Sequence, residues 1–490
     1  MGKKKIEDSK VRNELMEKFY ITTPIYYATD RPHIGHAFAT LHADVISRHK
    51  KLQGKEVFFL TGTDEHGVKI AEKAAEENKT PQEYVDETSS HYKEVWNVLN
   101  INFSDFIRTT DPKHKEGVFK FIKKLFDSGA IYKDKYKGLY CIGCERFLAE
   151  KDLINGLCPN HLRPPQKISE ENYFFDLQKY LPEIRRKIKT EELKISPASR
   201  RNETLGFIEA GIDNFSITRE KVKWGIPFPE DENQTIYVWV EALMNYVTAL
   251  DFPDGEKYKK FWPADLHIIG AEINKFHTVF WPAMLLAINE PLPKEIFIHG
   301  LFTVNGQKMS KSLGNVIDPL ALIEKFGPDA SRYLLLSQFP ASEHGDIKEE
   351  QFIKKYNADL ANGIGNLFER VLTMAKSADL RGKDAEILAF YQKIQDDYSQ
   401  KMNNYQLYEA LAAVFSFVKK LDQYINTTEP WRLIQNKNPE TEKILNTLIF
   451  GIKNIIVWLK PFMPKKMEKA ENYLENLGQS SEKLNLFPRI

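Results

Sequence analysis

The sequence lacks the features that mark several broad classes of protein. It has only three cysteines in 490 residues, all between Cys141 and Cys158, so a disulfide framework is excluded and a reducing compartment is favoured. No apolar run approaches the ~20 residues that span a bilayer, and the basic N-terminus has no apolar core for export. The formal net charge of +1 argues against a histone-like or membrane-coating protein. These absences predict a cytoplasmic protein that makes no contact with a membrane.

The chain also lacks a Gly-x-x-x-x-Gly-Lys loop, which excludes the P-loop route to phosphate binding. Its apolar content of 42% and aromatic content of 12% are typical of a globular protein. With 490 residues it is too long for one hydrophobic core, because domains of ~100–200 residues are usual. We therefore expect two to four domains.

The first half of the chain has the pattern of an α/β protein. Residues 19–27 and 57–60 have the composition of buried strands, and a helix begins at Ile34 between them. Two strands joined through a helix predict a right-handed parallel crossover. Later strands of the same parallel sheet are expected at 266–269 and 296–299.

Two segments depart from this pattern. From about residue 131 to residue 215, cysteines, Gly and Pro turns and a charged helix interrupt the sheet, so we expect an insertion there. From about residue 351 the pattern is purely helical and predicts a helical bundle. The expected domains are the first half of the sheet (1–128), the connective insertion (129–215), the second half of the sheet (216–300), a linker domain (301–350) and the α-helical domain (351–490).

A histidine pair begins the first helix, in His33-Ile34-Gly35-His36. The N–H groups and partial positive charge of a helix N-terminus suit a phosphate, and two imidazoles three residues apart can both face it. Gly35 would let a base or ribose approach the backbone closely. Taken alone, the motif is more often a pair of helix-start residues without a catalytic task, because short motifs match by chance.

A lysine pair follows much later, in Lys308-Met309-Ser310-Lys311-Ser312. Glycines on both sides indicate a mobile loop. Two lysines three residues apart can stabilise the charge that builds on a pentavalent phosphorus and on leaving pyrophosphate. For this motif alone, a solvated surface loop is an equally good explanation.

Together and in this order, the two motifs resemble the signatures of class I aminoacyl-tRNA synthetases. The resemblance implies a split Rossmann-type parallel sheet, ATP as substrate, Mg²⁺ bound through the phosphates, and an aminoacyl adenylate formed without a covalent enzyme intermediate. It assigns catalysis to His33, His36, Lys308 and Lys311. The ATP contacts that it implies are His33, Gly35, His36, Gly270, Glu272, Lys308, Met309, Ser310 and Lys311. At Glu272 many relatives carry aspartate.

The residues just ahead of the first motif and between the two motifs resemble the methionyl branch of this class. The resemblance implies L-methionine as the substrate, with Asp64 holding its ammonium group, Arg219 as the charged neighbour of Asp64, and aromatic groups around the polarisable thioether. Asp64 and His277 are hard to explain as core residues, because buried polar groups need partners. The apolar members of the set, taken singly, are better explained by core packing. The expected methionine contacts are Pro24, Ile25, Tyr27, Asp64, Arg219, Trp239, Leu243, Tyr246, Ile273 and His277.

The three cysteines and one histidine have metal-ligand spacing. Cys141-Ile142-Gly143-Cys144 and Cys158-Pro159-Asn160-His161 are separated by 13 residues. Three thiolates and one imidazole complete a tetrahedral structural zinc site and leave no position open for catalysis. Unrelated buried thiols are the less favoured alternative. We therefore expect a zinc knuckle with one Zn²⁺ held by Cys141, Cys144, Cys158 and His161.

The helical half extends the resemblance to the methionyl branch. There, the matching residues read the anticodon of tRNA(Met), which implies this role for Asn366, Arg370 and Trp431. Asn366 and Arg370 lie four residues apart on one helix face, and an indole offers a stacking surface for single-stranded RNA. Without the resemblance, a polar helix stripe and an anchoring tryptophan explain these residues equally well.

Two other functions remain open from the sequence. One keeps adenylate chemistry with another amino acid or a non-tRNA acceptor, and the other is a tRNA-binding paralogue without catalysis. The intact signature residues argue against the second, and the three anticodon-matching residues argue against a non-tRNA acceptor. The favoured function is ATP-dependent activation of methionine and its transfer to tRNA(Met) for initiation and elongation of protein synthesis. Some relatives carry a C-terminal tRNA-binding or dimerising domain, which we do not expect here, so the expected state is a monomer.

Overall fold

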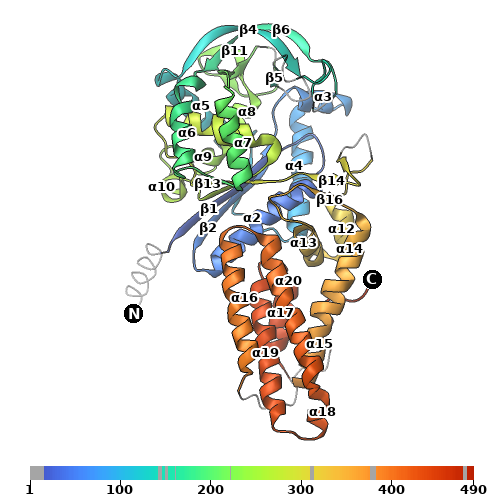
Figure 1. Ribbon diagram of the computed structural model, residues 1–490. Coiled ribbons are helices and arrows are strands. Elements are labelled where there is room, and N and C mark those ends of the chain that lie inside the picture. Colours follow the sequence, from blue (N-terminus) through green and yellow to red (C-terminus); the bar gives the residue numbers. More distant parts are fainter. Residues whose placement is uncertain are drawn as a thin grey trace, which may run out of the picture. The chain divides into compact units, whose positions relative to one another are not determined.

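A computed structural model describes residues 16–141, 146–148, 150, 153–159, 162–220, 222–309, 314–375, 382–477 and 483–490 (Figure 1). These residues form two compact units. Unit 1 comprises the described residues up to Pro32 together with Lys50–Trp96 and Asn102–His299. Unit 2 comprises His33–His49, Asn97–Ile101 and the described residues from Gly300 onward. The histidine-pair helix therefore groups with the C-terminal half, whereas the sequence assigns it to the first half of the parallel sheet.

A six-stranded sheet with the order β3-β2-β1-β12-β13-β7 forms the centre of unit 1, and every neighbouring pair is parallel. The four strands predicted from the sequence are confirmed as β1, β2, β12 and β13. Strand β7 lies inside the range expected to be an insertion, yet its three residues pair with β13, so this range also contributes an edge strand to the parallel sheet. The strands are β1 (Lys18–Tyr27), β2 (Glu56–Asp64), β3 (Asp105–Arg108), β7 (Lys194–Ser196), β12 (Leu266–Gly270) and β13 (Glu295–His299).

Strand order reverses at β1, which has β2 on one side and β12 on the other. In parallel sheets, ligands bind outside the carboxyl ends of the strands at such a point. The register between β1 and β2 shifts between Thr22 and Ile25, and the recorded pairing of β1 with β12 covers only Ile21 and Thr22. Pro24, which has no N–H to donate, lies in this irregular stretch. The irregularity frees Pro24 and Ile25 to line a pocket at the switch point.

A four-stranded antiparallel sheet, β5-β4-β6-β8, makes up the inserted part of unit 1. Its two long strands, β4 (Ile131–Cys141) and β6 (Gln166–Phe175), form the curved ribbon in Figure 1. The shorter strands are β5 (Arg146–Leu148) and β8 (Phe215–Ser216), and a separate sheet joins β9 (Thr218–Arg219), β10 (Pro227–Phe228) and β11 (Asp231–Ile236). The helices of unit 1 include α3 (Val68–Glu76), α4 (Pro81–Val98), α5 (Pro112–Asp127), α6 (Leu181–Lys189), α7 (Ala198–Glu209), α8 (Val238–Leu243), α9 (Asn245–Thr248), α10 (Glu256–Phe261) and α11 (Trp281–Ala287).

Unit 2 combines helix α2 (Ile34–Leu52) up to His49, a small three-stranded sheet and a helical bundle. Within the bundle, α16 packs on α17, and α19 packs on both α17 and α20 (Figure 1). The described residues after 351 that have regular structure are all helical, as predicted. The other elements are β14 (Phe302–Val304), β15 (Gln307–Lys308), β16 (Gly345–Ile347), α12 (Pro319–Phe326), α13 (Pro328–Leu336), α14 (Glu349–Lys355), the π-helix η6 (Tyr356–Gly365), α15 (Asn366–Ala375), α16 (Ala385–Asn403), α17 (Leu407–Thr428), α18 (Pro430–Gln435), α19 (Glu440–Leu459) and α20 (Pro464–Glu475).

A fully buried arginine holds unit 2 together. Arg332 on α13 donates to Asp44 of α2 at 2.6 Å, and also to the carbonyl oxygens of Leu99, Pro461 and Phe462 at 2.8–3.0 Å. Burying a guanidinium is costly unless its charge and donors are satisfied, and here both conditions are met. This network explains why α2 groups with the helical half of the chain.

Among the described residues, no helix combines the length and the apolar character that crossing a bilayer would require.

Candidate active site

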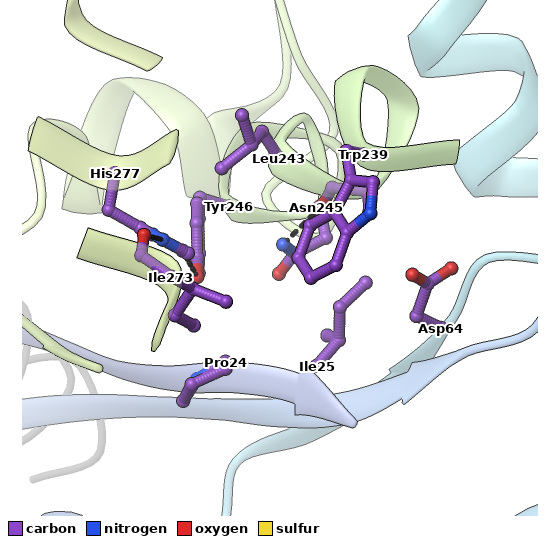
Figure 2. A pocket seen from close by; sticks show the side chains of 10 residues that line it. Pro24, Ile25, Asp64, Trp239, Leu243, Asn245, Tyr246, Ile273 and His277 are labelled. Carbon is purple, nitrogen blue, oxygen red and sulfur yellow. Dashed lines mark hydrogen bonds between the residues drawn. The ribbon is translucent and has the colours of Figure 1, made fainter. Parts of the chain in front are cut away.

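A pocket opens in unit 1 at the switch point of the parallel sheet, with an empty volume of about 290 Å³. Figure 2 shows Asp64 at one end of the pocket and Tyr246 and His277 at the other. The lining residues are Pro24, Ile25, Asp64, Trp239, Ala242, Leu243, Asn245, Tyr246, Ile273 and His277.

Helices α8 and α9 provide one side of the pocket. Trp239, Ala242, Leu243 and Tyr246 follow the spacing i, i+3, i+4 and i+7, so successive helical turns present them to the same side. The Trp239 ring stacks on Phe276, with 4.6 Å between centroids and 15° between planes. This stacking holds the indole against the pocket.

The apolar end of the pocket contains a hydrogen-bonded chain with a fixed direction. His277 lies in the π-helix η4 (Phe276–Phe280), and its Nδ1 is 3.0 Å from the carbonyl oxygen of Ile273. Because a carbonyl only accepts, Nδ1 carries the proton and Nε2 accepts from the Tyr246 hydroxyl at 2.7 Å. Burial lowers the pKa of His277 to about 4, despite its hydrogen bond to Ile273, and raises that of Tyr246. Both side chains are therefore neutral at physiological pH.

The lowered pKa of His277 predicts acid sensitivity. Between pH 6.5 and pH 4 the unfolded chain binds a proton at this residue that the folded chain does not, so the free energy of unfolding falls as the pH falls. The loss from this residue reaches about 3 kcal/mol by pH 4. We expect His277→Gln to lose correspondingly less stability than the wild type in urea titrations at pH 7 and pH 4.5. Parallel losses in the two proteins would contradict the prediction.

The polar end of the pocket is formed by the last residue of β2. Asp64 is 6% exposed, and its carbonyl oxygen accepts from the N–H of Ala28 at 2.8 Å. Gly62, two residues earlier, has no room for a side chain, since a Cβ would lie 2.0 Å from the carbonyl oxygen of Ile107. The end of β2 is thus closely packed against β3, which fixes the position from which Asp64 projects.

Eight of the ten residues expected to contact methionine line this pocket. The other two lie elsewhere in unit 1. Tyr27 packs on a separate cluster that includes Ala28 and Tyr84, and the Arg219 guanidinium stacks 3.8 Å from the ring centroid of Tyr237. Two further lining residues, Ala242 and Asn245, were missed. The i+3 spacing from Trp239 would have indicated Ala242, but no pattern indicated Asn245.

The two signature histidines lie together in unit 2. Their rings stack with 3.8 Å between centroids, and each Nδ1 accepts a backbone N–H, His36 from His33 at 3.2 Å and His33 from Gly35 at 3.0 Å. Both neutral rings therefore carry their proton on Nε2. Burial, together with its neighbour His33, holds the pKa of His36 well below its usual value.

Two of the first N–H groups of α2 have hydrogen-bond partners within the protein, whereas the sequence pattern predicts that these groups are available to a phosphate. Ile34 donates to the carbonyl oxygen of Ile317 at 3.2 Å, and Gly35 donates to His33. Gly35 also has a packing role, because a Cβ there would lie 2.9 Å from the His33 ring and 3.3 Å from Met309. The glycine makes room for the folded-back imidazole.

The first signature lysine belongs to a hairpin. Lys308 pairs with Thr303 between β14 and β15, and the turn residues Asn305 and Gly306 both have positive φ, at 53° and 76°. Lys311 and Ser310 lie outside the described residues. In unit 1, a Cβ at Gly270 would lie 3.1 Å from the Glu272 carboxylate, so the glycine keeps this turn open.

Two of the four expected zinc ligands are described. Cys141 at the end of β4 and Cys158 are both buried and pack in one small cluster with Leu148. The N–H of Cys158 donates to the carbonyl oxygen of Arg163 at 2.9 Å. Cys144 and His161 lie outside the described residues. Two thiols gathered in one cluster fit the donor set of a structural zinc site.

The expected anticodon residues lie on neighbouring helices of the bundle. Arg370 on α15 donates to Asp422 at 2.8 Å and to Asn426 at 2.9 Å, both on α17. Its guanidinium lies 5.7 Å from the ring centroid of Trp431, which is 38% exposed. Asn366 is exposed at the start of α15. The guanidinium and indole thus form one partly exposed cluster, and Asp422 and Asn426 are members that the sequence did not indicate.

Comparison with known proteins identifies the family. The family model for tRNA synthetases class I (M) matches residues 19–167 and 161–372, and that for the anticodon-binding domain of tRNA ligase matches 384–485. The methionine–tRNA ligase of Clostridium acetobutylicum is 41% identical over 485 residues, spanning 96% of this chain and 75% of that protein. The Thermotoga maritima methionine–tRNA ligase is 41% identical over 94% of this chain and 77% of its own length. The chain belongs to the class I tRNA synthetases (M).

A solved structure of the class I tRNA synthetases (M) has the same fold over nearly the whole chain. Mycobacterium tuberculosis methionyl-tRNA synthetase in complex with methionyl-adenylate matches with a TM-score of 0.91 and 33% identity, covering 97% of this chain and 100% of that chain. The likeness confirms the fold class predicted from the sequence, a split parallel sheet followed by an all-helical domain.

Proposed function

We propose that the pocket of unit 1 binds L-methionine in the reaction of this family. The enzyme activates L-methionine with ATP to methionyl-adenylate and transfers the methionyl group to tRNA. The observation that supports the pocket assignment is its polarity: a buried carboxylate, Asp64, at one end and aromatic and imidazole rings at the other. Methionine has the complementary order, with a cationic ammonium at one end and a polarisable thioether at the other.

Each end of the pocket contributes differently to binding. Asp64 would accept charge-assisted hydrogen bonds from the ammonium group. The Tyr246 hydroxyl donates its hydrogen bond to His277, so the hydroxyl oxygen can offer only lone pairs to the ligand. The edge of the Tyr246 ring would contact the ligand as well. Trp239, Leu243 and Ile273 would enclose the thioether methyl by fit. We propose the same role for Pro24 and Ile25, and we propose that Tyr27 and Arg219 also contribute to methionine binding.

ATP activation requires the methionine carboxylate to attack the α-phosphorus as pyrophosphate leaves. We propose that His33 and His36 donate hydrogen bonds from their Nε2–H groups to the phosphates, because both Nδ1 atoms accept hydrogen bonds from the backbone. Lys308 and Lys311 would stabilise the charge on the leaving pyrophosphate. Mg²⁺ bound through the phosphates would supply further positive charge. The remaining ATP contacts proposed are Gly35, Gly270, Glu272, Met309 and Ser310.

We propose that the helical domain reads the anticodon of tRNA(Met). Asn366 and Arg370 would hydrogen-bond base edges, and Trp431 would stack on an unpaired base. The hydrogen bonds from Arg370 to Asp422 and Asn426 support this assignment, since they hold the guanidinium at a defined place beside the indole. We expect the enzyme to work as a monomer in the cytoplasm, where its tRNA product is used.

We also propose one structural Zn²⁺ at Cys141, Cys144, Cys158 and His161. Metal analysis of the purified chain should give about one zinc per chain. Cys144→Ser should lower the zinc content and the melting temperature, while the matched change His91→Asn at a partly exposed histidine of α4 should leave both unchanged. A zinc content near zero in the wild type would contradict the assignment of this site.

The proposed function is tested by ATP–pyrophosphate exchange with each of the twenty amino acids. We expect methionine to drive exchange with the highest kcat/KM, and leucine and isoleucine, which lack the thioether, to drive it poorly. Faster exchange with another amino acid would overturn the assignment of the pocket. If no amino acid drove exchange while tRNA bound, a binding-only role would be favoured.

A further inference from the structure

A carboxylate behind the pocket joins several of the elements that form it. Glu241 is completely buried on α8, between the pocket residues Trp239 and Leu243 in sequence. Its Oε1 lies 2.7 Å from Nδ1 of His66, and its Oε2 lies 2.8 Å from Nε2 of His114. An ionised carboxylate only accepts, so both histidine nitrogens donate.

The two histidines come from different elements. His66 lies two residues beyond Asp64, just after β2 ends, and is 2% exposed. His114 lies on α5 and is fully buried, and its Nδ1 is 2.8 Å from the Thr248 hydroxyl on α9. One side chain on α8 therefore connects the end of β2, helix α5 and, through His114, helix α9. The turn that follows Asp64 and the aromatic side of the pocket are therefore joined by the same network.

Glu65, which lies between Asp64 and His66, is also held in place by hydrogen bonds. The Glu65 carboxylate is fully buried and accepts from Thr63 at 2.6 Å and from Arg108 at 2.7 Å. Its N–H donates to the Thr109 hydroxyl at 2.9 Å. These bonds fix the backbone of the Asp64–His66 turn against β3, and the Glu241 bonds fix it against α8.

The charge on Glu241 strengthens this link. Burial acts to raise the pKa of Glu241, but His66 and His114 outweigh it, and the pKa lies below its usual value. A buried carboxylate with two imidazole donors forms hydrogen bonds about twice as strong as those between neutral groups. Removing its charge would leave buried donors unsatisfied.

We propose that Glu241 is a positioning residue for methionine: it fixes Asp64 relative to the Trp239–Leu243 side of the pocket without touching the substrate. This inference rests on the proposed assignment of the pocket to methionine. A displacement of about 1 Å at a binding group can cost about 100-fold in rate, so a loose connection here would weaken methionine binding.

The test is Glu241→Gln in methionine-dependent exchange. A glutamine amide can accept from only one histidine and turns a donor toward the other. We expect the KM for methionine to rise about 10- to 100-fold, while the KM for ATP stays within about twofold of wild type. A merely structural role would lower the amount of active enzyme and leave both KM values unchanged.

The matched control is Glu290→Gln. Glu290 is a carboxylate of the same unit that accepts from Tyr258 at 2.6 Å and from Lys124 at 3.3 Å, and it does not line the pocket. Its substitution should lower the melting temperature and leave the KM for methionine unchanged. An unchanged methionine KM in folded Glu241→Gln, or an equal rise in both KM values, would overturn the inference.

If Glu241→Gln does not fold, a second pair of variants tests whether the Glu241 network positions the methionine site. His114→Gln keeps an N–H donor near the position of Nε2, whereas His114→Leu does not. We expect a higher methionine KM in the leucine variant than in the glutamine variant, and equal KM values would contradict the inference. Failure of methionine to drive exchange in the wild type would reject the pocket assignment itself, which separates the two outcomes.

Discussion

Asp64→Asn should lower kcat/KM for methionine in ATP–pyrophosphate exchange about 100- to 4,000-fold. The substitution keeps the shape of the side chain and removes its charge. Asp64 is 6% exposed, so water cannot replace the lost interaction with the ammonium group. Removing one partner of a buried ion pair costs about 3–5 kcal/mol, and each 1.4 kcal/mol is a factor of ten.

The effect should appear in the methionine parameters and not in protein folding. The Asp265→Asn variant is a suitable control, because Asp265 accepts from the N–H of Tyr20 at 2.7 Å and from Lys294 at 2.7 Å in the same unit. It should melt at a lower temperature with kcat/KM for methionine unchanged. A kcat/KM within threefold of wild type in Asp64→Asn would show that the ammonium group binds elsewhere.

Trp431→Ala should lower kcat/KM for tRNA charging about 5- to 150-fold and leave methionine-dependent exchange unchanged. The indole is 38% exposed beside the Arg370 guanidinium, and stacking of one base on an aromatic ring is worth about 1–3 kcal/mol. Exchange requires no tRNA, so it reports on the integrity of the enzyme in the same preparation.

Two variants sharpen this test. Trp431→Phe keeps an aromatic surface and should retain more charging activity than Trp431→Ala. Val457→Ala on α19 removes another exposed apolar side chain of the bundle, 55% exposed, and should charge tRNA normally. If Trp431→Ala lost charging and exchange equally, the tryptophan would act through stability and not through the anticodon.

The parallel sheet could be predicted because its central strands are continuous apolar runs. Strand β7 could not, because three residues give no periodicity and its place in the sheet depends on pairing with β13, about one hundred residues later. The grouping of α2 with the helical half also depends on distant partners. Phe38 contacts Phe302 at 4.5 Å between centroids, and Asp44 pairs with Arg332.

The pocket was predictable in outline through family resemblance and helical spacing. The residues behind the pocket could not be predicted. Glu241 and His114 are polar residues that no local pattern distinguishes from surface residues, and their burial follows from packing among α5, α8 and β2. The hydrogen bond from Ile34 to Ile317, which uses one N–H group of the helix N-terminus, could not be predicted either.

The π-helix that carries His277 constrains the length of the chain as well as its composition. One residue corresponds to about 100° of helical rotation, and a π-turn holds one residue more than an α-turn. Deleting a single residue within Phe276–Phe280 would restore an ordinary α-helix and turn Ile273 and His277 away from Tyr246, if α11 kept its packing. Insertions and deletions should therefore be rarer in this segment than substitutions in the course of evolution. An alignment of relatives should show constant spacing between the histidine and α11 even where the intervening side chains vary.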